Sequence, residues 1–333
     1  MTNQEQKIID RFGRVHDYLR ISLTERCNLR CTYCMPEEGI PLRDKAEFMS
    51  TEELISIAKV FVKLGVKKIR LTGGEPLVKK GFENLIRKLA ELPVEIALTT
   101  NAILIDKYID VLKEANVKKI NVSLDSLKSD VFNAISRRKY FGKIMENIDL
   151  LILNEFHIKI NVVLIKGTNE NEIVDFLEWA NTKNTHIQFI EFMPFDGNNW
   201  NLEQNVSFKE IMKAISYYYG IENILKIEDA KNDTARNYKI INSTATFGII
   251  SSVTNPFCST CNRIRLTADG KIKNCLFSQT ETDLLTSFRK GEEIEELILN
   301  SIHSKYKERG GLEEFSNDSV KKNKNRSMTV IGG

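Results

Sequence analysis

The feature that most constrains the fold is an alternation of β-rich and helical segments from about residue 17 to residue 195. The expected strands are Tyr18–Leu23, Lys68–Thr72, Glu95–Thr99, Lys119–Ser123, Lys159–Leu164 and His186–Phe192. The expected helices between them are Thr51–Leu64, Phe82–Ala90, Asp106–Ala115, Gly142–Asn154 and Glu172–Asn181. Six β/α units in this order predict an α/β fold with a parallel sheet, curled by right-handed crossovers. Since a complete TIM barrel has eight units, we expect an incomplete (βα)6 TIM-type barrel, open on one side.

Unusual segments follow several of the expected strands. The first strand is followed by TERCNLRC, the second by GGEP and the third by TN, and the sixth ends at EFMP. In parallel α/β barrels the active site lies at the carboxyl ends of the strands. We therefore expect these segments to meet at one mouth of the barrel.

Composition narrows the function classes. A net charge of +3 over 333 residues predicts no general attraction to nucleic acid or to a membrane surface. The opening MTNQEQKIID lacks the apolar core of a secretory signal, and no run approaches the roughly 18 apolar residues of a membrane helix. Six cysteines are too few for a disulfide-rich secreted scaffold of this length. The expected location is the cytoplasm.

The first cysteine group has the spacing C-x3-C-x2-C and consists of Cys27, Cys31 and Cys34. Three thiolates on one tight loop can hold three irons of a cubane cluster, and the missing fourth ligand leaves one iron open to a small molecule. A structural zinc site is an alternative, although such sites are usually closed by four ligands. Unpaired core cysteines are a third interpretation. The spacing favours an iron–sulfur cluster.

With this spacing and an aromatic residue, Tyr33, before the third cysteine, the chain resembles the radical S-adenosylmethionine (SAM) superfamily. A lone GGEP would indicate only a turn, but Gly73 to Pro76 match the second motif of that superfamily. The resemblance implies a 4Fe–4S cluster whose open iron is chelated by the amino and carboxylate groups of SAM. It also implies reductive cleavage of SAM to methionine and a 5′-deoxyadenosyl radical.

The second cysteine group has the spacing C-x2-C-x13-C and consists of Cys258, Cys261 and Cys275. In isolation it is typical of half a zinc ribbon, but the nearest histidine, His303, is far along the chain. A second cluster with an open iron is therefore the favoured interpretation, and such an iron can bind a substrate. Arg263 and Arg265 follow Cys261 and project to one side if the segment is extended, which suits an anionic ligand. Ordinary solvated arginines are the alternative.

A narrower resemblance, to the GTP 3′,8-cyclase family of molybdenum cofactor biosynthesis, extends nearly from end to end. Its matching segments are FGRVHDYLRISLTERCNLRCTYCMPEEG, IRLTGGEPL, LTTN, INVSLD, INVVLIKG, FIEFMP, FCSTCNRIRLTADGKIKNCLF and the final GG. The resemblance implies two 4Fe–4S clusters, one for SAM and one near GTP. The 5′-deoxyadenosyl radical would take the ribose 3′ hydrogen, and the ribose would close onto carbon 8 of guanine. The product would be (8S)-3′,8-cyclo-7,8-dihydroguanosine 5′-triphosphate, which a cyclic pyranopterin monophosphate synthase uses next; an electron donor is also required.

The resemblance also assigns site residues. The implied SAM contacts are Tyr33, Gly74, Ser123 and Met193. The implied GTP contacts are Arg20, Arg70, Thr99, Lys159, Arg263, Ile264 and Arg265. Fixed cations would suit the roughly four negative charges of a triphosphate. Strand cations that point outward, and strand-end hydroxyls that only make local hydrogen bonds, are the alternative interpretation.

The catalytic assignments are Arg263, Arg265, Gly332 and Gly333. In this family the C-terminal diglycine is thought to thread into the active site, where larger side chains would not fit; a frayed end is the alternative. Two positions depart from the family pattern. Gln188 stands where many relatives have arginine, which would weaken a triphosphate contact unless another cation substitutes, and Asn262 replaces a threonine or serine without expected consequence.

We expect two regions, a radical SAM partial barrel over residues 1–195 and a C-terminal region over residues 196–333 with the second cluster, the GTP-binding arginines and the tail. The sequence leaves a homodimer open. One rival interpretation is another radical SAM enzyme with an auxiliary cluster. Another is a metal-binding protein without catalytic activity.

Overall fold

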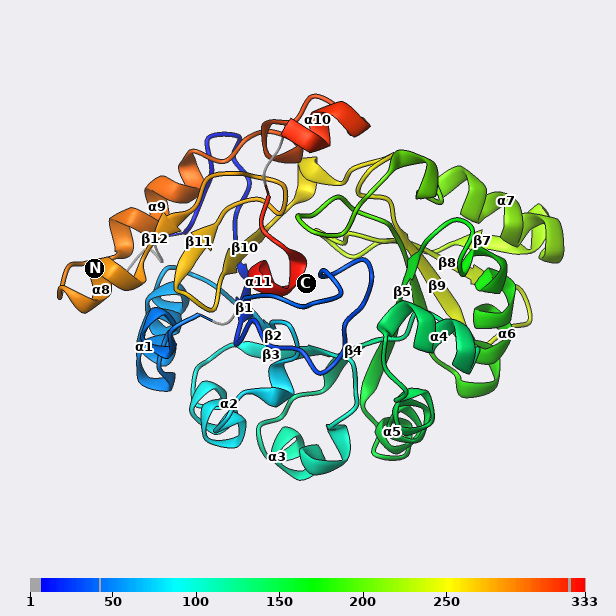
Figure 1. The fold of residues 1–333 in the computed structure, drawn as a ribbon, viewed down its shortest axis with the longest axis horizontal. Helices are drawn as coiled ribbons and strands as arrows, with labels where there is room; N and C mark the ends of the chain where they lie inside the picture. The colour runs from blue at the N-terminus through cyan, green and yellow to red at the C-terminus, as the bar shows by residue number, and fades with distance from the viewer. Residues whose placement is uncertain (1–6, 42, 323–324, 333) are drawn as a thin grey trace.

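The protein is built around one twelve-stranded sheet that curls into an open arc with helices on its outer side (Figure 1). The structure, a computed structural model, describes residues 7–41, 43–322 and 325–332. The strand order is β12-β11-β10-β1-β2-β3-β4-β5-β6-β9-β8-β7. Strands β1 to β6 therefore lie side by side in chain order, as the β/α alternation predicts.

The six central strands pair in parallel. Their bounds are β1 (Tyr18–Ser22), β2 (Lys68–Thr72), β3 (Glu95–Thr100), β4 (Lys119–Ser123), β5 (His157–Leu164) and β6 (His186–Glu191). The helices that follow them are α1 (Thr51–Lys63), α2 (Phe82–Ala90), α3 (Ile109–Glu114), α4 (Ser129–Ser136), α5 (Phe141–Leu153) and α6 (Ile173–Lys183). Each expected strand and helix thus has a counterpart. Only α4 has no counterpart among the predictions.

Two local differences have simple physical reasons. The segment expected as one helix at 106–115 divides into a 3-10 turn at Ile105–Lys107 and the shorter α3. Helix α4 spans only eight residues and buries two large apolar side chains, Phe132 and Ile135, so its sequence carries little periodic signal. In contrast, the strong start signal of α1 is present, because Ser50 and Glu53 form a reciprocal capping box.

The C-terminal region extends the sheet at both edges. Its elements are α7 (Phe208–Tyr219), β7 (Ile224–Lys226), β8 (Arg236–Ile240), β9 (Thr246–Ile250), β10 (Arg263–Leu266), β11 (Lys271–Lys273), β12 (Thr282–Asp283), α8 (Leu285–Arg289), α9 (Glu295–His303), α10 (Asn317–Lys322) and α11 (Met328–Ile331). Strand β9 pairs in parallel with β6, and β10 pairs in parallel with β1. The sheet is therefore wider than the predicted six strands, because alternation alone does not show which later strands join its edges.

The main hydrophobic core lies between the sheet and its helices, and it leaves the carboxyl ends of β1 to β6 free to carry the site. The chain end returns to this mouth, where α11 lies at the centre of the arc (Figure 1). A smaller apolar cluster joins Ile331 of this helix to Phe195 and Phe277. No helix in the described ranges has the length and apolar character needed to span a bilayer.

Candidate active site at the mouth of the barrel

The first cysteine group lies in the loop after β1, enclosed by protein atoms. Burial raises the pKa of all three thiols, of Cys27 to about 11 and of Cys31 and Cys34 well above the usual range. The Leu29 amide donates a hydrogen bond to Cys27 Sγ over 3.4 Å, and the Asn101 side-chain amide approaches the same sulfur at 3.9 Å. The loop therefore holds three free thiols, with Cys31 buried and Cys27 and Cys34 partly buried, and N–H donors are directed at Cys27.

The GGEP segment packs directly against this loop. The Gly74 amide donates to the Thr24 carbonyl over 2.7 Å, and the Glu75 amide donates to the Arg26 carbonyl over 2.9 Å. A Cβ atom on Gly74 would lie 2.7 Å from the carbonyl carbon of Arg26, so alanine cannot fit unless the cysteine loop moves. Gly73 has a φ of 148° and its added Cβ would lie 2.6 Å from the Thr24 carbonyl oxygen. The two glycines are required by this close backbone approach.

Glu75, the third residue of the GGEP segment, connects this segment to the end of β3. Its carboxylate accepts hydrogen bonds from Thr100 Oγ1 (2.8 Å) and from the amides of Asn101 (2.7 Å) and Leu77 (3.1 Å). Burial nevertheless raises the pKa of Glu75 to about 7. The carboxylate thereby ties the end of β3 to the turn after β2.

The Tyr33 side chain lies among the first cysteine group and the loop after β4. Its hydroxyl donates a 2.7 Å hydrogen bond to Asp125 Oδ2, and the Val163 amide donates to Asp125 Oδ1 over 2.9 Å. Burial and the charge of Asp125 raise the pKa of Tyr33 well above its usual range. Asp125 itself is buried, and its pKa is raised to about 6 by that burial. This tyrosine is held neutral next to the first cysteine loop.

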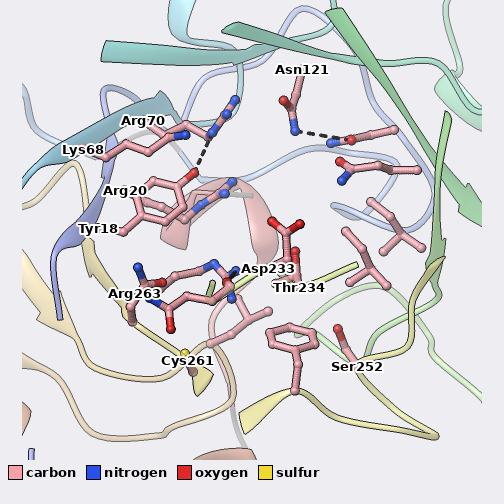
Figure 2. Close-up of a pocket in the computed structure, with 18 of the residues that line it drawn as sticks. Tyr18, Arg20, Lys68, Arg70, Asn121, Asp233, Thr234, Ser252, Cys261 and Arg263 are labelled. Carbon is pink, nitrogen blue, oxygen red and sulfur yellow. Dashed lines mark hydrogen bonds between the residues drawn. The ribbon is translucent and has the colours of Figure 1, made fainter. Parts of the chain in front are cut away.

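A cavity of about 900 Å³ lies within the barrel (Figure 2), and the first cysteine loop is not among the described residues that line it. Its wall holds three arginines in register on adjacent strands, because Arg20 of β1 is the direct partner of Arg265 on β10 and of Arg70 on β2. A second row lies two residues earlier, where Tyr18 is the partner of Arg263 and of Lys68. All six of these side chains line the cavity.

The tyrosine in this wall is embedded among cations (Figure 2). Arg70 Nε donates to the Tyr18 hydroxyl over 2.7 Å, and the Lys68 ammonium and the Arg263 guanidinium lie 5.3 Å and 5.9 Å from its ring centroid. Burial alone would raise the pKa of Tyr18, but the positive charges of Arg70 and Arg20 outweigh it and lower the pKa to about 7. The phenol is therefore poised to ionise near neutral pH.

The cations also act on one another. Burial and neighbouring positive charges lower the pKa of Arg20 to about 9 and that of Arg265 to about 10. Burial lowers the pKa of Lys159, which lines the same cavity from β5. Holding so many like charges in one wall is unfavourable without a counter-charge, so the cavity is suited to a ligand with several negative charges.

The second cysteine group lines this cavity, with Cys258 and Cys261 on a 3-10 turn before β10 and Cys275 just after β11. Lys305 is 2% exposed and donates to Cys261 Sγ over 3.4 Å and to the Arg263 carbonyl over 3.1 Å. Burial raises the pKa of the Cys261 thiol, but the charges of Lys305 and Arg263 dominate and lower it to about 6. The Arg309 amide donates to Cys258 Sγ over 3.5 Å.

Both cysteine groups fit an iron–sulfur cluster by donor type. Each offers three free thiols close in the fold, with N–H donors that reach a sulfur, as is common around cluster ligands. Within the residues that the structure describes, no three His, Cys, Asp or Glu side chains are spaced for a single metal ion. A cubane needs a different spacing, because its ligand sulfurs bind different irons.

The C-terminal tail enters between the two cysteine groups. Ser327 Oγ donates to the Cys34 carbonyl over 2.8 Å, and Ile331 and Gly332 are buried. A Cβ atom on Gly332 would lie 2.6 Å from Thr72 Oγ1 and 3.0 Å from Ser22 Cβ, at the ends of β2 and β1. Its φ of 79° also favours glycine. Gly333 lies outside the described residues.

The remaining sequence-predicted residues are not all in the cavity wall. Met193 lines the cavity, as does Gln188, which is 7% exposed. Thr99 and Ser123 are not among the described residues that line it, although Thr99 Oγ1 accepts a 3.4 Å hydrogen bond from Arg70. Ile264 is fully buried in the main core, so its side chain faces away from the cavity.

Sequence reasoning missed several wall residues. Residues 230–234 form a loop over the cavity, with Asp233 and Thr234 directed into it (Figure 2), and Asn232 offers its carbonyl to Arg263 Nη2 at 3.1 Å. The polar letters KNDT carry no signal for this placement. Tyr18, in contrast, was detectable, because it lies two residues before Arg20 on one strand and so faces the same side.

Comparison with known proteins places this geometry in a family. The family model of the radical SAM superfamily matches residues 21–180, and that of Molybdenum Cofactor Synthesis C matches residues 185–310. The crystal structure of Streptococcus suis SuiB bound to S-adenosylmethionine has a similar fold, with a TM-score of 0.65 over 88% of this chain and 69% of that one at 14% sequence identity.

Sequence relatives are much more similar. The chain is 40% identical to a GTP 3′,8-cyclase of Listeria welshimeri over 98% of this chain and 100% of that protein. It is 41% identical to the mitochondrial GTP 3′,8-cyclase of Arabidopsis thaliana over 98% of this chain and 83% of that protein. Molybdenum cofactor biosynthesis protein 1 of Dictyostelium discoideum is 42% identical over 98% of this chain, which spans only 52% of that relative. This chain belongs to the GTP 3′,8-cyclase family, within the radical SAM superfamily.

Proposed function

We propose that the protein converts GTP to (8S)-3′,8-cyclo-7,8-dihydroguanosine 5′-triphosphate. The observation that carries this proposal is the cavity, in which a cationic wall and the three cysteines of the second group face one space. The wall suits a triphosphate and the cysteines suit a substrate-binding cluster. Activity of this kind is also what the names of the Listeria and Arabidopsis relatives state for those proteins.

Cys27, Cys31 and Cys34 would hold the first 4Fe–4S cluster. When bound, this cluster and SAM would supply a 5′-deoxyadenosyl radical, the species proposed to remove the ribose 3′ hydrogen. Gly74 fixes the position of the loop by its contact with Arg26, and Tyr33 and Ser123 stand at the edge of the same site. These residues, with Met193, are the proposed SAM contacts.

The cationic wall would bind the triphosphate. Arg20, Arg70, Arg265 and Lys159 supply fixed charges from four strands, and Arg263 is held in place by Asn232 and the rings of Phe257 and Tyr18. Because a rigid cationic wall needs little reorganisation on binding, it can fix the ribose relative to the first site. Thr99 would act by orienting Arg70, and Ile264 through its backbone.

Cys258, Cys261 and Cys275 would hold a second 4Fe–4S cluster with one open iron near the guanine base. Lys305 and the Arg309 amide support this assignment, because both donate to sulfurs of the group. Where many relatives have arginine, Gln188 offers only an uncharged amide. Lys159 supplies a cation in the same cavity.

Net conversion of GTP to this product is an isomerisation. The 3′ hydrogen of the ribose would end in 5′-deoxyadenosine after transfer to the 5′-deoxyadenosyl radical. The C3′–C8 bond would form, and one electron from the electron donor and one proton would complete the reduced purine. Gly332 and Gly333, with Arg263 and Arg265, would hold the reacting nucleotide in position. Burial of Gly332 against Ser22 and Thr72 supports a role for the tail inside the site.

The two regions of the chain would have different tasks. Residues 1–195 would carry SAM chemistry and residues 196–333 the second cluster, the GTP-binding arginines and the tail. An electron donor and the synthase that forms cyclic pyranopterin monophosphate would be the partners. The proposed location is the cytoplasm, on the basis of the sequence, and a homodimer is left open.

The direct test is anaerobic incubation of the cluster-loaded protein with SAM, a reductant and GTP. We expect 5′-deoxyadenosine, methionine and a compound with the mass of GTP but a different chromatographic retention. SAM cleavage with GTP recovered unchanged would contradict the cyclase proposal. ATP in place of GTP is the matched control and should give no isomer.

A further inference from the structure

A group of buried carboxylates lies between the two cysteine loops and has no part in the function proposed above. It consists of Glu25 in the loop after β1, Asp269 in the turn between β10 and β11, and Glu281 just before β12. We call these three residues the carboxylate cluster. The side chains of Glu25 and Asp269 are 5% and 3% exposed, and that of Glu281 is 12% exposed. Buried carboxylates of this kind require cationic partners.

One side chain of the C-terminal tail reaches all three members of the cluster. Arg326 Nη1 is 2.8 Å from Glu281 Oε2, and Arg326 Nη2 is 3.0 Å from Asp269 Oδ2 and 3.4 Å from Glu25 Oε1. A planar guanidinium with several donors can span separate carboxylates in this way. Burial lowers the pKa of Arg326, but the charges of Asp269 and Glu281 raise it overall, as expected for a well-matched cation.

The tail beyond Arg326 has little intrinsic stability. Helix α11 has only four residues, which is too short to persist by itself. Its position depends on contacts at either end, where Ser327 binds the Cys34 carbonyl and Gly332 fits against Ser22 and Thr72. A strong contact just before α11 would therefore determine whether Gly332 stays in the barrel mouth.

The carboxylates also connect both halves of the site. Glu25 lies two residues before Cys27, and Asp269 lies in the turn that leads through β11 to Cys275. Arg43 bridges two of the same acids, with 2.9 Å to Glu25 and 3.2 Å to Asp269, and among the described residues its hydrogen bonds and ion pairs include none to the tail. Arg326 alone among these cations belongs to the tail segment.

We propose that Arg326 is a positioning residue that clamps the C-terminal tail onto the carboxylate cluster and, by the same contacts, ties the loop of Cys27 to the turn before Cys275. The clamp holds Gly332 at the ends of β1 and β2. Its consequence for turnover rests on the proposed function, whereas the clamping of the tail does not.

Hydrogen–deuterium exchange of the anaerobically prepared, cluster-loaded protein tests the clamp without turnover. The amides of Val330 and Gly332 donate to Ser327 and Met328, so their exchange reports opening of the tail. In Arg326→Ala we expect exchange in residues 327–332 to accelerate by about tenfold or more, because charged hydrogen bonds that hold the tail are lost. Iron content should not change.

Arg43→Ala is the matched control, because it removes a guanidinium from the same acids without touching the tail. Its tail exchange should stay within about twofold of wild type. The double variant Arg326→Gln with Glu281→Gln removes one positive and one negative charge together. If Arg326→Ala misfolds only because its buried carboxylates lack a counter-charge, the double variant should fold. We expect the tail to remain exposed in this variant.

Turnover gives an independent readout. Arg326→Lys keeps the charge but cannot span three carboxylates, so we expect partial tail protection and a lowered kcat with little change in the KM for GTP. Unchanged tail exchange in Arg326→Ala, equal acceleration in Arg43→Ala, or full protection in the charge-balanced double variant would each overturn the clamp. If the wild-type protein does not cyclise GTP, the proposed function is contradicted. The exchange result would still test the clamp, because it does not depend on turnover.

Discussion

The two cysteine groups offer the same three donors in opposite surroundings. The first is enclosed, with the carboxylates of Glu75 and Asp125 nearby, and burial raises the pKa of its thiols. The second lines an open cavity beside Lys305 and Arg263, and these cations lower the pKa of Cys261 to about 6. The difference suits two tasks under the proposed function, because only the second group lies in the cationic wall that would bind the triphosphate.

Two tyrosines repeat this contrast. Tyr33, beside the first group, donates to Asp125 and is held neutral by burial and that negative charge. Tyr18, in the cationic wall, accepts from Arg70 and has its pKa lowered to about 7. The pKa values of the two tyrosines therefore shift in opposite directions, because Tyr33 lies beside a negative charge and Tyr18 lies among positive charges.

The strongest test of the contrast is removal of either cysteine group. Reconstituted wild-type protein should contain about eight irons and eight sulfides per chain. Replacing Cys27, Cys31 and Cys34 with alanine should leave about four irons and abolish SAM cleavage. Replacing Cys258, Cys261 and Cys275 should also leave about four, but with SAM still bound at the first cluster. Stoichiometric zinc without iron after anaerobic purification would refute the assignment of both groups.

A single methyl group should disturb the first site alone. Gly74→Ala places a Cβ against the Arg26 carbonyl group and must displace the cysteine loop, so we expect SAM cleavage to fall on the order of a hundredfold. Gly142→Ala is the control, since nothing lies within 4 Å of its added Cβ. Binding of GTP to the cationic wall, measured by calorimetry, should stay near the wild-type value in both variants. Full SAM cleavage by Gly74→Ala would show that the close contact is not needed.

Changes in the wall should have the converse effect. Arg263→Ala or Arg265→Ala should weaken GTP binding by about 1.5–3 kcal/mol, as expected for loss of a charged hydrogen bond to an anion. SAM binding should be nearly unchanged, because both arginines lie on the side of the second group. Equilibrium binding of each ligand to the two variants checks this. Normal GTP affinity in both would mean that the arginines do not contact the nucleotide.

The smallest expected effect is spectroscopic. A pKa of about 7 for Tyr18, below its usual value near 10, predicts a tyrosinate absorbance step near neutral pH in the free, cluster-depleted protein. Because the folded pKa is lowered, the associated stabilisation is present above the unfolded pKa and disappears as pH falls through about 7. GTP adds negative charge and should raise the pKa, so the step should move to higher pH. Tyr18→Phe should remove it, and its persistence in that variant would assign it elsewhere.

Much of the fold follows from the sequence alone. Strands β2 and β4 agree with the expected bounds, because each is a short β-rich segment with clear turns on either side. The pairing of β9 with β6 and of β10 with β1, on opposite sides of the six central strands, does not follow, since pairing of distant segments leaves no periodic pattern. The site divides in the same way. Spacing alone indicates the cysteine groups, whereas only the tertiary fold brings Lys305 to Cys261 and Asp233 to the cavity.

Transfer of the ribose 3′ hydrogen is the most direct measurement of the central claim. GTP carrying deuterium at the 3′ position should yield 5′-deoxyadenosine that is heavier by one mass unit, together with the cyclised isomer, when incubated anaerobically with SAM and a reductant. GTP labelled at carbon 8 should yield unlabelled 5′-deoxyadenosine. If the 3′-labelled substrate gives only unlabelled 5′-deoxyadenosine and is recovered intact, the cationic cavity does not serve the cyclisation of GTP.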